Sequence, residues 1–296
     1  MPLLNPPNIL PNGMHLIAKY LAIHGKPVDR QRLKAALQPS TLPLRRDGTN
    51  TFDACLKALQ DLTLITADGA AMSAAPDLKA VADARAFGEV LLFAVCSGAE
   101  AGQDDAATPQ RDLLVALTWW CAQDPYGPPI GWQEVGRLLS HDLGTGFASF
   151  PIGNTNPWQS FIRWATALGF AEHDGLAPRS TSTLVPDITR AVKAVLRPRQ
   201  ADGETTASRL IGLLQTRLPM IDGGLLATAL RSDWNLPAGR RAAANALDVA
   251  LSHALLRCEE DGVLKLANRS DAEKVLLSDG PEVRPFSHAV FHEVAS

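Results

Sequence analysis

The sequence has few of the features that mark a metal site or a disulfide-stabilised protein. It contains only four cysteines in 296 residues, and no two of them form a CxxC pair. Cysteines scattered in this way indicate reduced thiols in a hydrophobic core rather than zinc ligands or disulfides. They are Cys55, Cys96, Cys121 and Cys258. We therefore expect no structural metal.

Long hydrophobic runs are also absent. The longest apolar stretches, 87–96 and 113–122, are shorter than the roughly 20 residues that a helix needs to cross a bilayer. The N-terminus carries prolines and asparagines where a signal peptide would have an unbroken apolar segment. These observations predict a soluble, cytoplasmic protein without membrane contact, in which both stretches form buried helices.

Catalytic motifs are missing as well. There is no phosphate-binding GxxxxGKS/T loop and no GxSxG nucleophile turn. His288 and His292 have the i, i+4 spacing of two metal ligands on a helix, but their terminal segment favours a strand. The enzyme alternative, a hydrolase or metal-dependent nuclease with an unfamiliar site, would be supported if both histidines bound metal. Asp104 and Asp105 lie in a polar linker, which cannot hold the fixed geometry of acid–base catalysis. We expect no catalytic residue, no cofactor and no bound metal.

The charge balance limits how nucleic acid could be bound. The formal net charge is −3, with 28 Lys and Arg against 31 Asp and Glu. A protein that binds DNA non-specifically along its whole length is usually strongly basic. Only residues 1–86 have a distinct positive excess, with ten basic against seven acidic residues. Any DNA contact would therefore depend on small local groups.

A weak internal repeat is present. Three times, an amphipathic helix pattern is followed by a few small or polar residues, an Asp-Gly pair and a short strand-like run. Asp-Gly is a strong hairpin signal, because glycine adopts positive φ without steric cost. The predicted hairpin tips, or wings, are Asp68-Gly69, Asp174-Gly175 and Asp261-Gly262.

Helix patterns precede each predicted wing. In the first repeat, apolar faces occur near 16–23, 33–37 and 52–62, with Asp29 and Asn50 in N-cap positions. Three helices followed by a hairpin is the order of a winged helix, a variant of the helix-turn-helix. The sequence thus predicts a mainly α fold of tandem winged-helix (wHTH)-like units with small β-hairpin wings.

Three such units are predicted. The first is 1–86, the second is 87–200 and includes a helical linker, and the third is 201–296 with a C-terminal tail. In the third unit we expect a long helix from about Gly239 to Cys258, and a closing strand within 284–294.

Candidate DNA-binding residues follow from this arrangement. The third helix of a winged helix fits the major groove, and the wing reaches phosphates. Polar and basic residues at those positions are Arg45, Arg46, Asn50, Lys57, Asn156, Gln159, Arg163, Arg179, Arg240, Arg241 and Asn245. The same residues can be solvated surface groups, because winged helices also dock proteins. Contact with double-stranded DNA, a docking scaffold without DNA contact, and a transcriptional regulator all stay open.

The opening LLNPPNILPNGMHLIAKYL, followed by successive winged-helix-like units, resembles the DpdG family. That family belongs to bacterial gene clusters that insert 7-deazaguanine derivatives into DNA and restrict DNA lacking them, an anti-phage defence. The resemblance implies helicase- or nuclease-bearing partner subunits, and it supplies no catalytic residues for these positions. With the residue patterns, it predicts a non-catalytic DNA-binding or assembly subunit of such a restriction system.

Overall fold

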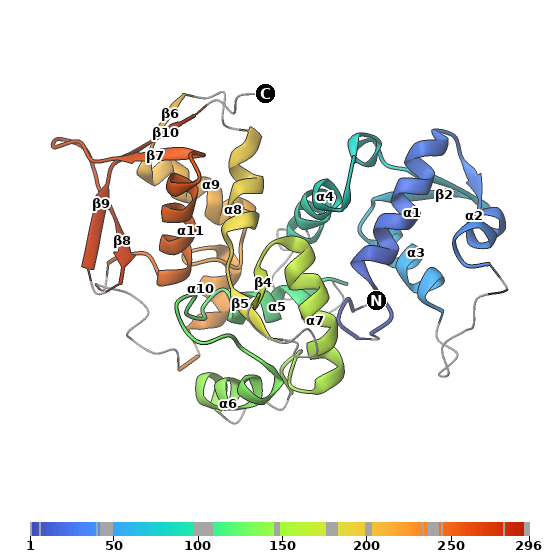
Figure 1. Ribbon diagram of the computed structural model, residues 1–296, viewed down its shortest axis with the longest axis horizontal. Coiled ribbons are helices and arrows are strands. Elements are labelled where there is room, and N and C mark those ends of the chain that lie inside the picture. Colours follow the sequence, from blue (N-terminus) through green and yellow to red (C-terminus); the bar gives the residue numbers. More distant parts are fainter. Residues whose placement is uncertain are drawn as a thin grey trace. The chain divides into compact units, whose positions relative to one another are not determined.

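The computed structural model is mainly helical, with small antiparallel sheets (Figure 1). Among the residues it describes, no helix is both long enough and apolar enough to span a membrane. The described residues are 2–5, 7–39, 41, 50–97, 109–144, 149–175, 183–198, 203–232, 234–235, 243, 245–280 and 282–292.

Internal contacts divide the chain into two compact units. Unit 1 consists of Met1–Leu113 and Asn154–Leu168, and unit 2 of Leu114–Gly153 and Gly169–Ser296. The chain therefore passes between the units three times along its sequence. The three units expected from the sequence follow a different division, which stays a prediction.

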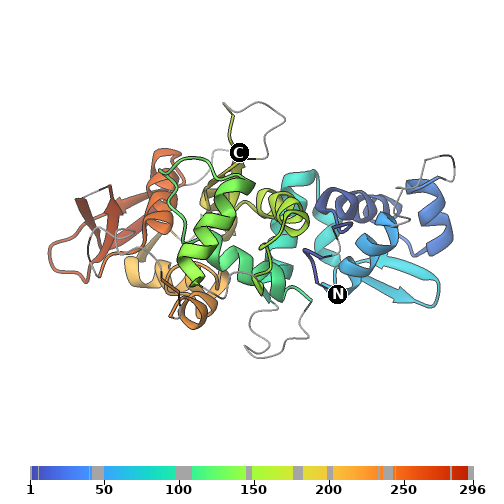
Figure 2. The same ribbon diagram turned by 90° about the horizontal axis from the view of Figure 1, so that it is seen from below.

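Unit 1 begins with a three-stranded sheet and three helices. The strand order is β1-β3-β2, with both pairings antiparallel. Gly69 has φ 58° at the tip between β2 and β3, which confirms the predicted hairpin. This hairpin extends beyond the unit 1 helices in Figure 2, where it is cyan. The elements are α1 (Pro11–His24), β1 (Val28–Asp29), α2 (Arg30–Leu37), α3 (Thr51–Asp61), β2 (Ile65–Asp68) and β3 (Ala71–Ala74).

The rest of unit 1 consists of a 3-10 turn, η1 (Pro76–Ala80), and two helices, α4 (Ala84–Ser97) and α7 (Thr155–Leu168). The predicted buried helix at 87–96 is confirmed as part of α4. α4 and α7 approach closely at Gly88, where an added Cβ would lie 2.4 Å from the carbonyl oxygen of Ala167. Buried aromatic side chains on α7, among them Trp158, Phe161 and Trp164, contribute to the core.

The first part of unit 2 contains a short strand pair and two helices. Strands β4 and β5 are antiparallel, and Ile130 forms a further bridge to Leu184 in β5. Trp119 and Trp120 are fully buried, which confirms the buried helix predicted at 113–122. Asp174 follows β4 as expected for a hairpin, but residues 176–182 lie outside the described chain. The elements are α5 (Arg111–Trp120), which starts in unit 1, α6 (Trp132–Leu143), β4 (Ala171–His173) and β5 (Leu184–Pro186).

The second part of unit 2 contains a sheet of order β6-β10-β7 and a separate hairpin, β8-β9. Strand β10 confirms the closing strand predicted within 284–294. The elements are α8 (Thr189–Leu196), β6 (Glu204–Thr206), α9 (Ala207–Arg217), α10 (Leu225–Arg231), α11 (Val249–Glu260), β7 (Leu264–Ala267), β8 (Val275–Asp279), β9 (Glu282–Phe286) and β10 (His288–Phe291).

Two predictions for this region are wrong. The helix expected from about Gly239 begins at Val249, because Asp248 caps it by accepting a hydrogen bond from the Leu251 N–H at 2.9 Å. Asp261-Gly262 is not a hairpin tip. Gly262, with φ 68°, ends α11 just before β7, since a positive-φ glycine suits a helix C-terminus as well as a turn.

One strand order recurs through the chain. In the three-stranded sheet of unit 1, the first strand along the chain, β1, pairs with the last, β3. In the three-stranded sheet of unit 2, the first strand of that sheet, β6, likewise pairs with its last, β10. The bridge of Ile130 to β5 repeats this pairing in reduced form. A helix starts directly after each of these first strands, namely α2, α6 and α9.

Candidate nucleic-acid interface

The N-terminus of α3 is organised around Asp53. Asn50 caps the helix by accepting the Asp53 N–H at 3.2 Å, and its amide nitrogen donates to the Asp53 carboxylate. Arg30 and Lys34, both on α2, bind the same carboxylate at 2.8 and 2.7 Å. Burial alone would raise the pKa of Asp53, but hydrogen bonds from Lys34 and Arg30 hold it below its ordinary value of 3.8. The predicted site residue Asn50 is thus engaged within the protein.

Lys57 lies one turn further along α3 and forms an i, i+4 ion pair with Asp61. Exposed pairs of this type contribute at most about 1 kcal/mol, because water screens them. Lys57 can therefore release Asp61 and bind a phosphate at a small cost in free energy. Even so, the exposed cations on and beside α3 have carboxylate partners, which weakens the attraction of this face for DNA.

α7 presents a different surface. Its polar residues Asn156, Gln159 and Arg163 lie opposite the buried aromatic face; Asn156 and Arg163 are exposed and Gln159 is partly exposed. Spacings of three and four residues place these side chains one above the other along the helix. None of the three side chains has a hydrogen-bond or ion-pair partner among the described residues. We call this set the α7 polar stripe.

The charge pattern around α7 favours contact with an anion. Between Asp142 and Glu172 the sequence contains a single charged residue, Arg163. Carboxylates close to a DNA-binding surface repel the phosphate backbone, and this stretch of 29 residues contains none of them. The α7 polar stripe therefore combines two neutral hydrogen-bonding side chains with one arginine that has no ion-pair partner among the described residues.

Of the other predicted residues, Asn245 lies within the described part of the chain. Asn245 is exposed in a turn before Ala246, which bridges to β8, so it does not line the start of a helix as the sequence predicted. The reason is that Asp248, three residues later, is the N-cap of α11. Residues outside the described chain are Arg45, Arg46, Arg179, Arg240 and Arg241.

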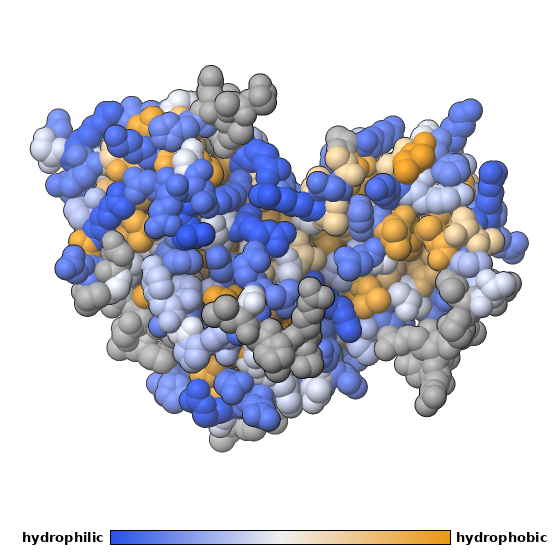
Figure 3. Space-filling view, viewed as in Figure 1, coloured by the Kyte–Doolittle hydropathy of each residue, from blue (hydrophilic) through white to orange (hydrophobic). Residues whose placement is uncertain are grey.

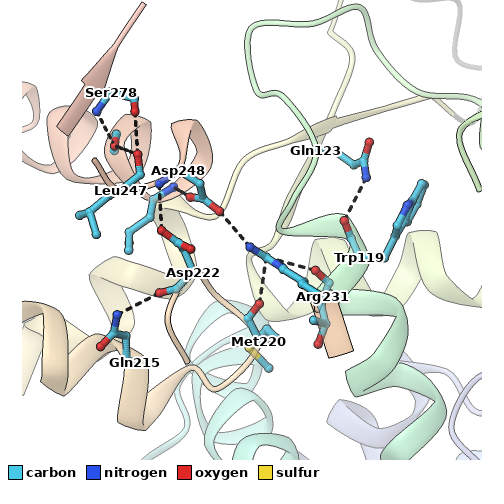
Figure 4. A network of polar contacts seen from close by, with 12 residues as sticks. Trp119, Gln123, Gln215, Met220, Asp222, Arg231, Leu247, Asp248 and Ser278 are labelled. Atoms are coloured by element: carbon cyan, nitrogen blue, oxygen red, sulfur yellow. Dashed lines mark hydrogen bonds and ion pairs between the residues drawn. The ribbon is translucent and has the colours of Figure 1, made fainter. Parts of the chain in front are cut away.

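A buried polar network in unit 2 was not predicted from the sequence (Figure 4). Arg231, the last residue of α10, donates to Asp248 at 3.1 Å. It also donates to the carbonyl oxygens of Thr118 and Met220, both at 3.2 Å. The side chains of Arg231 and Asp248 are only 12% and 9% exposed. Arg231 thus joins α5, α10 and the start of α11.

Asp248 connects this arginine to a second carboxylate. The Asp248 N–H donates to Asp222 at 3.0 Å, and the carbonyl oxygen of Asp222 accepts from Gln215 at 3.0 Å. Burial raises the pKa of Asp248; Arg231 opposes this shift and Asp222 adds to it. Because these groups face one another in the interior, we interpret the network as structural: it holds the N-terminus of α11 in place. An Asp directly before an apolar helix pattern is an N-cap signal, so Asp248 could have been found from the sequence.

Asp142, at the end of α6, is a second buried carboxylate. It accepts hydrogen bonds from Trp119 Nε1 at 2.8 Å and Gln123 Nε2 at 3.3 Å, and it lies 3.0 Å from Nδ1 of His141. A carboxylate in this position orients the imidazole of His141, whose side chain is 56% exposed. Among the described residues, no group of three or more His, Cys, Asp or Glu could hold a metal ion.

The Pro/Asn-rich N-terminal segment is a packed part of unit 1. The carboxylate of Asp112 accepts the backbone N–H groups of Leu3 and Leu4, at 3.0 and 2.7 Å. The N–H of Leu10 approaches Sγ of Cys55 at 3.4 Å, which ties the segment to α3. These contacts anchor the segment to the rest of unit 1.

Comparison with protein families supports the resemblance carried by this segment. A family model described as DpdG-like matches residues 1–272. The chain belongs to the DpdG-like family. Membership connects this DpdG-like chain with the Dpd system of 7-deazaguanine modification. The match extends through β7 and ends before β8. Comparisons with curated proteins and with solved structures found no match.

Other chemistry-bearing residues of the DpdG-like chain have ordinary roles. All four cysteines are free and buried, as predicted. Burial raises the pKa of the Cys55 and Cys258 thiols to about 11 and about 12. Both are protonated at neutral pH and are poor nucleophiles. His288 opens strand β10, so it does not share a helix face with His292.

Proposed function

We propose that this DpdG-like chain is a non-catalytic DNA-binding or assembly subunit of the 7-deazaguanine modification and restriction system. The observation that carries this proposal is the α7 polar stripe, whose Asn156, Gln159 and Arg163 side chains are unpartnered among the described residues. Catalytic activity would come from helicase- or nuclease-bearing partners. The chain would hold duplex DNA for them in the cytoplasm.

The recurring strand order supports the use of winged-helix modules. In such modules the helix that precedes the strand pair enters the major groove. In sequence order, α3 precedes β2 and β3 within unit 1, and α7 of unit 1 precedes β4 and β5 of unit 2. Asn and Gln side chains can bind adenine with two hydrogen bonds, and Arg can bind guanine or a phosphate. The stripe therefore offers both base readout and a phosphate contact.

We favour α7 over α3 as the main DNA contact because of their different electrostatics. Asn50 and Lys57 on α3 already bind carboxylates of Asp53 and Asp61. A phosphate would have to compete with these acids. Arg163 has no such competitor among the described residues.

The proposal is tested by fluorescence anisotropy of labelled duplex DNA, titrated with the full chain from low to physiological salt. The test variant is Asn156→Ala/Gln159→Ala/Arg163→Ala. A matched control is Gln133→Ala/Arg137→Ala/Ser140→Ala on α6, which removes three exposed polar side chains and the same charge from another helix.

We expect salt-dependent binding that the α7 variant weakens at least about tenfold, since a good bidentate base contact is worth about 1–3 kcal/mol. Loss of one phosphate contact should also reduce the slope of log K against log salt by about 1. The α6 variant should bind like the unmodified chain. Equal weakening by both variants would contradict a specific role of α7.

The basic residues outside the described chain remain part of the proposal. Arg45→Ala/Arg46→Ala and Arg240→Ala/Arg241→Ala should each flatten the salt dependence if these pairs bind phosphates. Absence of saturable binding to duplex DNA at low salt would overturn the DNA-binding role. The docking-scaffold function would then be favoured.

A further inference from the structure

Helix α1 carries an apolar face that the protein leaves uncovered. Leu16 is 57% exposed and Ile23 is 72% exposed, the largest exposed fraction of any large hydrophobic residue in the described chain. Tyr20, between them, is partly exposed and stacks on His24 with ring centroids 4.1 Å apart. Figure 3 shows hydrophobic surface over the region where α1 lies in Figure 1.

The three side chains form one continuous stripe. Spacings of four and three residues place Leu16, Tyr20 and Ile23 on the same side of the helix. The opposite side of α1, which includes Met14, Ile17 and Leu21, is buried in unit 1. α1 therefore has two apolar faces, and only one of them is used by the core. Isolated exposed hydrophobic residues are common, but a stripe at i, i+4 and i+7 is the pattern that packs against another helix.

The charges beside the stripe define the partner. Lys19 lies on the exposed side of α1 between Leu16 and Tyr20, and Lys26 follows the end of the helix. Neither lysine has an ion-pair partner among the described residues. No Asp or Glu occurs before Asp29 in the sequence. A docking segment would bind most tightly if it carried carboxylates on both sides of its apolar residues, where they can pair with these lysines.

A second copy of this chain is a poor occupant. Two α1 helices packed antiparallel about Tyr20 would bring Lys19 of one copy close to Lys19 of the other. Like charges placed side by side oppose association. A helix that carries apolar residues at i, i+3 or i+4, and i+7, with acidic residues beside them, satisfies both the stripe and the lysines.

We propose that the exposed face of α1, formed by Leu16, Tyr20 and Ile23 and flanked by Lys19 and Lys26, docks an acidic amphipathic helix of a partner protein. This surface requires no DNA contact. It would tether the chain to another component while α7 stays available on the same unit.

Site-specific photo-cross-linking tests the proposal. The full chain is expressed in its host cells with p-benzoylphenylalanine in place of Ile23, irradiated, and purified, and the cross-linked peptide is sequenced by mass spectrometry. We expect a peptide from another protein with apolar residues at helical spacing and with acidic residues between them. A cross-link mainly to a second copy of this chain, to a basic peptide or to no protein would overturn the proposal.

Binding of the identified peptide then decides whether the face is specific. A synthetic copy should bind the purified chain, and Leu16→Ser/Ile23→Ser should weaken that binding at least about tenfold, as expected for central residues of a helix interface. Lys19→Glu should weaken it too, and a peptide with Lys in place of its acidic residues should restore binding to that variant. Leu225→Ser, at a leucine that is 50% exposed on α10, is the matched control and should bind normally. Unchanged affinity in Leu16→Ser/Ile23→Ser, with normal circular dichroism, would contradict the proposal.

Discussion

Arg231 shows at the scale of single residues how unit 2 depends on buried charge. Its guanidinium binds Asp248 and two backbone carbonyl oxygens in the interior. Removing one partner of a buried ion pair leaves the other charge without compensation, which costs more than the pair itself contributes. The sequence does not reveal this contact, because Arg231 and Asp248 lie 17 positions apart and meet only through the tertiary fold.

Replacing Arg231 by Met should therefore lower the free energy of unfolding by about 3 kcal/mol or more. The measurement is urea denaturation followed by circular dichroism. Arg257→Met is the control, since Arg257 forms a surface pair with Glu260 that should contribute less than about 1 kcal/mol. Similar losses in the two variants would show that the buried network has no special role.

Asp53 predicts a pH dependence in unit 1. Its folded-state pKa is lower than the ordinary value of 3.8, so its ionised form stabilises the fold above that pH. This contribution is lost as the pH falls through the lowered pKa. Asp53→Asn should thus be less stable than the unmodified protein by about 1 kcal/mol at neutral pH, and the difference should vanish in strong acid.

Unfolding curves at several pH values measure this difference directly. Asp77→Asn, at an exposed carboxyl group of η1 in the same unit, serves as the control and should change little. A stability difference for Asp53→Asn that persists unchanged below the lowered pKa would contradict the role given to the Asp53 carboxylate.

At the scale of elements, the sequence predicts best where a local pattern determines the structure. The apolar periodicity near 52–62 and 113–122 and the N-caps Asp29 and Asn50 predict helices that are present. Asp-Gly is ambiguous: it forms a hairpin tip at Gly69 and a helix end at Gly262. The β8-β9 hairpin also turns at an Asp-Gly pair, Asp279-Gly280, so the same sequence signal predicts this turn.

The candidate site was predictable only in part. Asn156, Gln159 and Arg163 follow from the polar positions of an amphipathic helix, and the structure confirms that they share its outer side. Their freedom from partners could not be predicted, since it depends on which distant residues fold next to them. The partners of Asn50 and Lys57 are local, Asp53 at i+3 and Asp61 at i+4, so the sequence spacing does indicate these two contacts.

The close approach of α4 and α7 predicts opposite effects for two helical glycines. Gly88→Ala places a Cβ 2.4 Å from the Ala167 carbonyl oxygen, so the helices must separate. We expect destabilisation by about 1–3 kcal/mol. Gly136→Ala, on α6, meets nothing within 4 Å and should stabilise by about 0.5–1 kcal/mol, because alanine favours the helix.

Urea denaturation of both variants measures these changes, and each serves as the control for the other. A stabilised Gly88→Ala variant would show that α4 and α7 are not in close contact at Gly88.

At the scale of the whole molecule, the division into units makes a prediction about fragments. Residues 1–113 lack α7, which packs against α4 in unit 1. A 1–113 fragment should leave apolar residues of α4 exposed, such as Leu91, Leu92 and Val95 in its buried set. We expect it to bind a hydrophobic fluorescent dye and to melt without cooperativity.

Joining residues 154–168 to this fragment through a flexible linker should restore a cooperative melt and reduce dye binding. Circular dichroism and dye fluorescence measure both properties. If the fragment without α7 melts as cooperatively as the fusion, α7 is not an integral part of unit 1.

The three passages of the chain between its units also constrain how this protein can evolve. Unit 1 is encoded by two separate stretches of sequence, because α7 is preceded and followed by residues of unit 2. A recombination event with a single breakpoint transfers unit 1 whole only if the cut falls after residue 168, and it then also transfers residues 114–153 of unit 2. Unit 1 therefore cannot be exchanged in this way without dividing unit 2, so selection for an intact unit 2 favours inheritance of the two units as a pair.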